Sequence, residues 1–176
     1  SGTIREKQHL VRLLARRNEP ANRKRMLDIF ADFEAGKTPG ELHLDVIESA
    51  KAMNAPLWTK FEEARKLART PEARLKVYDV TLKGGDAARG RQIFVSHPVA
   101  QCVRCHKAEG QGGDAGPDLS VWSPKAKGDR GHFLESLLYP SRKFTPGFGA
   151  VALTMRDGRV LTGTVRSENK ENIVLA

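Results

Sequence analysis

Helix-breaking residues punctuate the first half of the chain at short intervals. Pro20, Gly36, Pro56 and Pro71 divide it into segments that favour short helices. Within the first two segments, apolar side chains recur at helical spacing: Ile4, Val11, Leu14, Met26, Ile29, Phe30 and Phe33. A short helix cannot bury an apolar face alone, so we expect residues 1–83 to form a stacked, helical-repeat-like scaffold.

One helix start in this region has a strong local signal. Thr38 is an expected N-cap, Pro39 an expected first helical residue, and Glu41 is placed to reach back as in a capping box. Apolar residues at helical spacing follow and predict a buried stripe: Leu42, Val46, Ala50 and Met53.

The composition changes at Lys83-Gly84-Gly85-Asp86, where a turn signal is followed by an expected N-cap. Glycine becomes more frequent beyond it, so we place a domain boundary here and expect a second domain over residues 84–176. That domain should contain helices over about 86–95 and 132–139, a hairpin of 150–155 and 160–166 around Asp157-Gly158, and a third strand near 172–175. The predicted fold is therefore mainly α with a small β-hairpin.

The net charge of +9 raises nucleic acid, an anionic membrane and an acidic protein as partners. The basic excess is spread along both halves of the chain, which argues against a nucleic-acid-binding stripe. The densest cluster, between Arg16 and Arg25, is interpreted as a solvated face. No apolar run approaches the ~18 residues of a membrane span.

The two cysteines form the run Cys102-Val-Arg-Cys-His106. This spacing is the attachment signature of c-type haem: two thiols form thioethers with the porphyrin, and the adjacent imidazole binds iron. A thioredoxin-like motif would need a βαβ setting, and a closed zinc site would need further ligands nearby. A disulfide between residues this close would be strained and would constrain little chain.

The residues around the motif resemble those of small class I cytochromes c. Gly90 and Phe94 lie four residues apart on the preceding predicted helix, and Gly116-Pro117-Asp118-Leu119 follows His106. The resemblance implies that the Pro117 carbonyl accepts the Nδ1 proton of His106, and that the Gly90–Phe94 face packs against a C-terminal helix.

A longer set of runs extends the resemblance: Gly84-Gly85-Asp86, Arg89–Phe94, Cys102–His106, Gly116–Leu119, Leu134–Leu138, Pro140-Ser141, Pro146–Phe148 and Asp157–Arg159, with Glu41–Glu48 in the repeat-like part. Together they resemble one cytochrome c type, the haem-binding domain of planctomycete and verrucomicrobial secreted proteins. In that family the haem domain often follows a β-propeller of dehydrogenase type and a set of helical repeats.

The resemblance implies an electron-transfer domain with one covalent haem c, which relays electrons and transforms no substrate itself. Its partner would be a redox protein or a fused dehydrogenase domain, and its location periplasmic or otherwise extracytoplasmic.

We expect the haem to contact Cys102, Cys105, His106, Pro117, Leu119, Trp122 and Phe148, with Arg130 and Arg142 as candidates for its edge. Asp114 and Asp118 are interpreted as loop and cap residues. The alternatives are a haem-based sensor with an open iron site and a basic helical adaptor.

The sixth iron ligand is the least defined element. Met155 is the only methionine after the motif, but it shares strand parity with Val151 and Leu153, which an apolar strand face explains. In the family, the axial methionine lies downstream of the hairpin in a Ser-x-Met-Pro segment. We therefore expect an incomplete haem domain, whose distal face is open, solvent-ligated or covered by another chain; Met155, His132, His97 and a lysine are the internal candidates.

Overall fold

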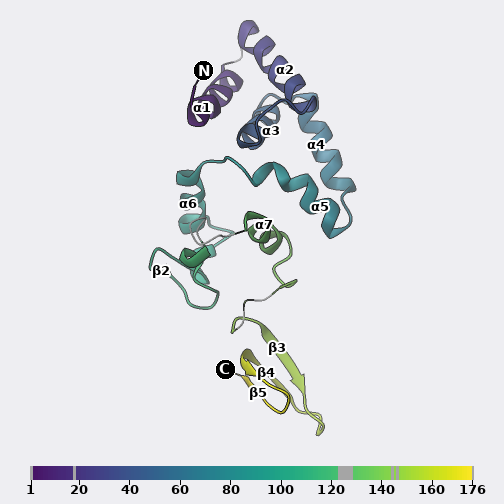
Figure 1. Cartoon of the computed structure of the whole chain (residues 1–176), viewed down its shortest axis with the longest axis vertical. Coiled ribbons are helices and arrows are strands. Elements are labelled where there is room, and N and C mark those ends of the chain that lie inside the picture. Colours follow the sequence, from purple (N-terminus) through teal and green to yellow (C-terminus); the bar gives the residue numbers. More distant parts are fainter. Residues whose placement is uncertain (1, 18, 123–128, 144, 146, 176) are drawn as a thin grey trace. The chain divides into compact units, whose positions relative to one another are not determined.

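The computed structural model describes residues 2–17, 19–122, 129–143, 145 and 147–175. It is mostly helical with small antiparallel sheets, as the sequence predicts at this level, and it divides into two compact units, residues 1–86 and 87–176. The division falls just after the predicted boundary, because Gly84, Gly85 and Asp86 belong to the first unit. Figure 1 shows the order of elements along the chain.

The first unit is a succession of short helices in which neighbours pack on one another. Its α-helices are α1 (Ile4–Arg16), α2 (Pro20–Glu34), α3 (His43–Ala52), α4 (Pro56–Leu67) and α5 (Pro71–Tyr78), with 3₁₀ turns η1 (Gly40–Leu42) and η2 (Asp79–Thr81). α1 packs against α2 and α3, and α4 packs against α3 and α5. Proline opens α2, α4 and α5, because its fixed φ suits the first helical position.

The predicted start at Thr38 is wrong in detail. The chain first makes the 3₁₀ turn η1, and α3 begins only at His43, without a side-chain N-cap. The Thr38 carbonyl oxygen instead accepts a hydrogen bond from Nε2 of His43 at 2.9 Å. This contact joins the first residue of α3 to the segment that precedes η1.

The hydrophobic core of the first unit joins α1, α2, α3 and α4. Met26 and Val46 are completely buried. The core cluster also contains Val11, Leu14, Phe30, Ile47, Ala50, Ala55 and Leu57. Most of the predicted apolar positions are therefore buried, whereas Ile29, Phe33 and Met53 are only partly buried against this cluster and Ile4 is exposed.

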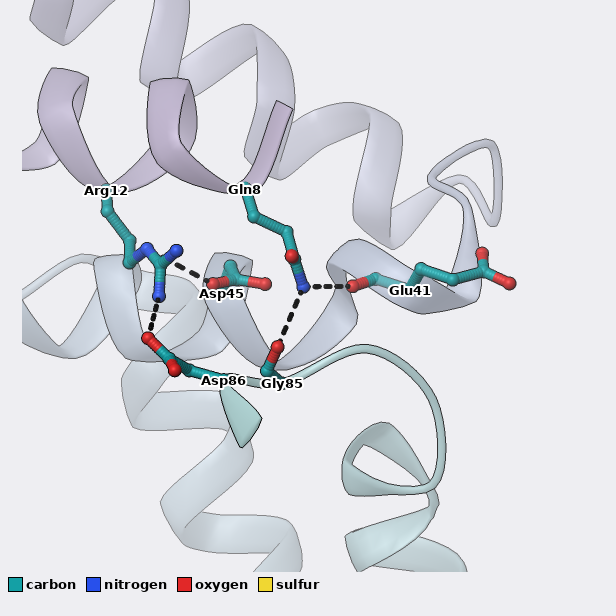
Figure 2. A network of polar contacts seen from close by, with 6 residues as sticks. All are labelled: Gln8, Arg12, Glu41, Asp45, Gly85 and Asp86. Carbon is teal, nitrogen blue, oxygen red and sulfur yellow. Dashed lines mark hydrogen bonds and ion pairs between the residues drawn. The ribbon is translucent and has the colours of Figure 1, made fainter. Parts of the chain in front are cut away.

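The predicted boundary turn is fastened to α1 by polar contacts (Figure 2). The buried Gln8 amide donates to the carbonyl oxygens of Glu41, at 3.1 Å, and Gly85, at 3.3 Å. Arg12 reaches the carboxylate of Asp86 at 3.4 Å. The predicted boundary residues Gly84–Asp86 are therefore held to α1 and η1 by these contacts.

Gly84 is the tightest point of this junction, and its replacement by Ala should destabilise the first unit. Gly84 has φ +71°, and a Cβ there would lie 2.0 Å from the Glu41 carbonyl oxygen. We expect Gly84→Ala to cost about 2–4 kcal/mol, combining the left-handed φ with a backbone clash. Gly36 is the matched control, because it has φ +70° and open space around its Cβ position, so Gly36→Ala should cost about 1 kcal/mol. Equal losses in urea unfolding would contradict the close approach at Gly84.

Asp45 should contribute more to the stability of the first unit at low pH than at neutral pH. Burial raises the pKa of Asp45 above its ordinary value of 3.8, although Arg12, 3.6 Å away, acts in the opposite sense. Its Oδ2 is buried without a hydrogen-bond partner. The neutral carboxyl therefore stabilises the fold below pH 3.8, and this contribution is lost as the pH rises through the raised pKa.

We expect the unfolding free energy of the wild type, relative to Asp45→Asn, to increase as the pH falls from about 7 to about 4. The difference in unfolding free energy between the two proteins removes the pH dependence that comes from the carboxylates they share. Urea titrations at several pH values measure it, and a difference that is constant or decreases on acidification would contradict the burial argument.

The second unit combines short helices with two small antiparallel sheets. Its helices are α6 (Ala87–Ser96), α7 (Arg130–Leu138) and the 3₁₀ turns η3 (Cys102–Arg104) and η4 (Leu119–Trp122). β1 (Lys107–Ala108) pairs with β2 (Gln111–Gly112), and β3 (Ala150–Thr154), β4 (Val160–Glu168) and β5 (Ile173–Leu175) form a meander in that order. The predicted hairpin and third strand are confirmed; the β1–β2 pair was not predicted.

No helix in the described residues is long and apolar enough to cross a membrane.

Candidate functional site

The Cys102–His106 run forms a single tight turn in the second unit. Gln101 enters it in the left-handed region, with φ 45°, and η3 follows. The amides of Cys105 and His106 both donate to the Cys102 carbonyl oxygen, at 3.2 and 2.9 Å. Cys102 is half-buried and Cys105 exposed, and neither forms a disulfide. The turn thus leaves both thiols available for reaction, close together in the chain.

A glycine-rich loop follows the motif and folds back on its backbone. The amide of Gly113 donates to the Val103 carbonyl at 2.9 Å, and that of Gly116 to the Cys105 carbonyl at 2.7 Å. A Cβ at Gly112 would lie 2.2 Å from the His106 carbonyl oxygen, and one at Gly113 would lie 2.1 Å from that of Arg104. Only glycine permits this approach, so the loop fixes the shape of the turn.

His106 is held by two contacts from the end of this loop. Its Nδ1 lies 3.0 Å from the Pro117 carbonyl oxygen, the contact that the cytochrome resemblance implies. The ring also lies against Gly116, where a Cβ would come within 2.6 Å of Cε1. A carbonyl can only accept, so Nδ1 donates its proton, and in the neutral imidazole the lone pair is then on Nε2.

Acidic side chains of the loop organise its polar contacts. Asp118 caps η4 by accepting from the Ser120 amide at 2.8 Å, and this bond lowers the pKa of Asp118. Asp114 pairs with Lys107 and raises the pKa of that amine. The hydroxyl of Ser120 in turn accepts from the Glu109 amide at 2.6 Å. The sequence interpretation of Asp114 and Asp118 as loop and cap residues agrees with these contacts.

An open groove of about 540 Å³ runs between α6 and the motif loop. Gly90 and Phe94 lie on its α6 side, and Val103 and Leu119 line it from the motif side. The space above Gly90 is empty to beyond 4 Å. The face that the resemblance assigns to a helix contact is therefore a wall of this groove in the described residues.

The remaining predicted haem contacts are less defined. Phe148 is half-buried, and its amide donates to the Thr145 carbonyl oxygen at 3.0 Å. Trp122 ends η4, but its side chain lies outside the described part of the chain. Arg130 begins α7 and is exposed, and Arg142 pairs with Glu135 at 3.4 Å.

The named candidates for the distal ligand lie on three different segments of the second unit. Met155 follows β3, is 41 % exposed, and its backbone bonds with Arg159 in the hairpin loop. His97 caps its own loop, because its Nδ1 accepts from the amides of Val99 and Ala100 at 3.3 and 3.1 Å. His132 is half-buried on α7. Among the described residues, no three His, Cys, Asp or Glu side chains gather as a metal-binding group.

A comparison with known protein families, curated proteins and solved structures finds no match for this chain.

Proposed function

We propose that the second unit binds one haem c covalently through Cys102 and Cys105, with His106 as an axial iron ligand. The observation that carries the proposal is the 3.0 Å contact between His106 Nδ1 and the Pro117 carbonyl oxygen. Metal-binding histidines commonly donate their second nitrogen to such an acceptor, which fixes the tautomer and the ring plane. The residues present therefore suit the group, with two free thiols and an oriented imidazole.

The burial pattern of the second unit supports a large apolar cofactor. Every residue that is buried in the described part of the chain lies between Gln8 and Ala68, in the first unit. The described apolar side chains of residues 87–175 are at most half-buried, including Phe94 and Leu119. A domain of this size ordinarily buries a core, and a porphyrin would provide apolar surface for these side chains to cover.

The proposed role is electron transfer. Haem iron supplies a one-electron couple, and the chain's own residues set its potential through the axial ligand, hydrogen bonding and burial. His106 would supply a nitrogen to the iron, the Pro117 carbonyl would hold its ring, and Leu119, which lines the groove beside the motif, would limit water near the porphyrin. By the resemblance, this makes the unit a class I cytochrome c-like, extracytoplasmic relay that receives electrons from a redox partner or fused dehydrogenase.

A haem-based sensor is the second candidate, and the position of Met155 favours it. This methionine, the only one after the motif, is 41 % exposed and lies in a hairpin loop. An iron without a protein ligand on its distal side would bind small gaseous ligands, whereas a carrier holds six-coordinate iron in both oxidation states.

The test is expression in a host that matures c-type cytochromes, followed by acid–acetone extraction and a pyridine haemochrome spectrum. The proposal predicts haem that stays with the protein through extraction, and release of all haem would contradict it. Carbon monoxide then separates the two roles. A low-spin ferrous form that does not bind carbon monoxide supports electron transfer, whereas a high-spin ferrous form that binds carbon monoxide supports sensing.

A further inference from the structure

The meander at the end of the second unit has one unprotected edge. Its order is β3-β4-β5, so β3 and β5 are its edge strands among the described residues. β5 is three residues long, and its pairing with β4 contains a bulge, two features that limit edge pairing. β3 is five residues long, pairs with β4 without a register shift, and consists of Ala-Val-Ala-Leu-Thr. It has no charge, proline or bulge to discourage another strand.

The ladder shows which backbone groups β3 presents at this edge. The Val165 amide donates to Gly149, and the Met155 amide donates to Arg159, on either side of the β3–β4 pairing. Because hydrogen-bonded and non-bonded pairs alternate in an antiparallel ladder, Val151 and Leu153 direct their amides and carbonyls toward β4. The corresponding groups of Ala150, Ala152 and Thr154 point outward.

The outward groups complement a second copy of themselves. In an antiparallel pairing centred on Ala152, Ala152 faces its equivalent, and Ala150 faces Thr154 of the second chain. Every outward amide and carbonyl then has a partner, as an isologous two-fold contact requires. No like charges oppose one another along the strand, because β3 carries none.

The side chains agree with this register. Val151 and Leu153 are half-buried on one face of β3, whereas Ala150, Ala152 and Thr154 are exposed on the other. Pairing about Ala152 places Val151 opposite Leu153 of the second chain, which keeps both apolar side chains on one face. A shift by one residue would place them on opposite faces.

We propose that the outer edge of β3 pairs with the β3 edge of a second copy of this chain, forming a six-stranded antiparallel sheet across a two-fold axis. This contact does not depend on haem binding. One strand pair is small beside a standard interface of about 1,600 Å², so the dimer should dissociate on dilution.

Sedimentation velocity of the full chain over a range of concentrations tests the proposal. Ala152→Lys opposes two ammonium groups across the axis and should weaken the dimer about tenfold or more. Ala152→Pro removes the outward amide that this register uses, leaves the β3–β4 bonds intact, and should act alike. Thr162→Lys is the matched control, because Thr162 lies opposite Ala152 on the central strand β4 and is equally exposed. It should leave the dimer unchanged.

A disulfide test fixes the register. Mixing Val151→Cys chains with Leu153→Cys chains under mild oxidation should give a disulfide between the two variants, because non-bonded antiparallel pairs have Cα atoms about 4.5 Å apart. Peptide mass spectrometry distinguishes this bond from any that involves Cys102 or Cys105. A monomer at every concentration, a dimer that survives both Ala152 variants, or the absence of this mixed disulfide would overturn the proposal.

Discussion

Replacing His106 by Ala should leave the haem attached but remove its strong axial field. The two proposed thioethers would depend on Cys102 and Cys105, which the substitution does not touch, whereas the imidazole Nε2 is the nitrogen that would bind iron. The expected result is full haem retention on a denaturing gel, with loss of the low-spin spectrum in both oxidation states. Added imidazole should restore part of that spectrum.

His9→Ala is the control for this experiment. His9 is exposed on α1 in the first unit, so its removal should change neither haem content nor the spectrum. An unaltered low-spin spectrum in the His106 variant would mean that another residue ligates the iron.

Gly116→Ala should weaken the iron–histidine bond without touching a ligand. A methyl group there would lie 2.6 Å from Cε1 and 2.7 Å from Nδ1 of His106, so the ring or the loop must move. Movement of either disturbs the Nδ1 bond to Pro117, and loss of such a supporting contact typically costs 10–100-fold in metal affinity, to an order of magnitude. We expect a mixture of low-spin and high-spin haem, measured by optical and electron paramagnetic resonance spectra.

Gly158→Ala provides the comparison, because Gly158 lies in the β3–β4 loop of the same unit, outside the groove lining, and nothing lies within 4 Å of its Cβ position. That variant should retain the wild-type spectrum, although the φ of +84° at Gly158 makes the substitution cost about 1 kcal/mol of stability. Identical spectra for the two variants would show that Gly116 does not position the imidazole.

Local signals predicted most of the secondary structure. Pro56 and Pro71 mark the starts of α4 and α5, and Asp157-Gly158 lies in the loop between β3 and β4. These features depend on φ preferences that each residue carries in any context. The start of α3 was predicted too early, because the 3₁₀ turn η1 comes first, and the contact of His43 with the Thr38 carbonyl is not indicated by spacing alone.

The candidate site was predicted unevenly for the same reason. Cys102, Cys105 and His106 are recognisable because their chemistry requires a fixed spacing. Gly112 and Gly113 were not assigned a role, although a glycine-rich segment directly after the motif was a signal that its backbone returns to the turn. The hydrogen bond from the Gln8 amide to the Gly85 carbonyl joins residues far apart in the chain, so no local pattern indicates it.

The mass of the proteolytic peptide that contains Cys102–His106, taken from protein matured in a c-type cytochrome host, tests the central claim most directly. Our account predicts one haem on that peptide, attached through both cysteines, and no thiol that iodoacetamide can alkylate. Single Cys102→Ala and Cys105→Ala variants should each keep one thioether. A wild-type peptide of unmodified mass, with two alkylated cysteines, would contradict the account.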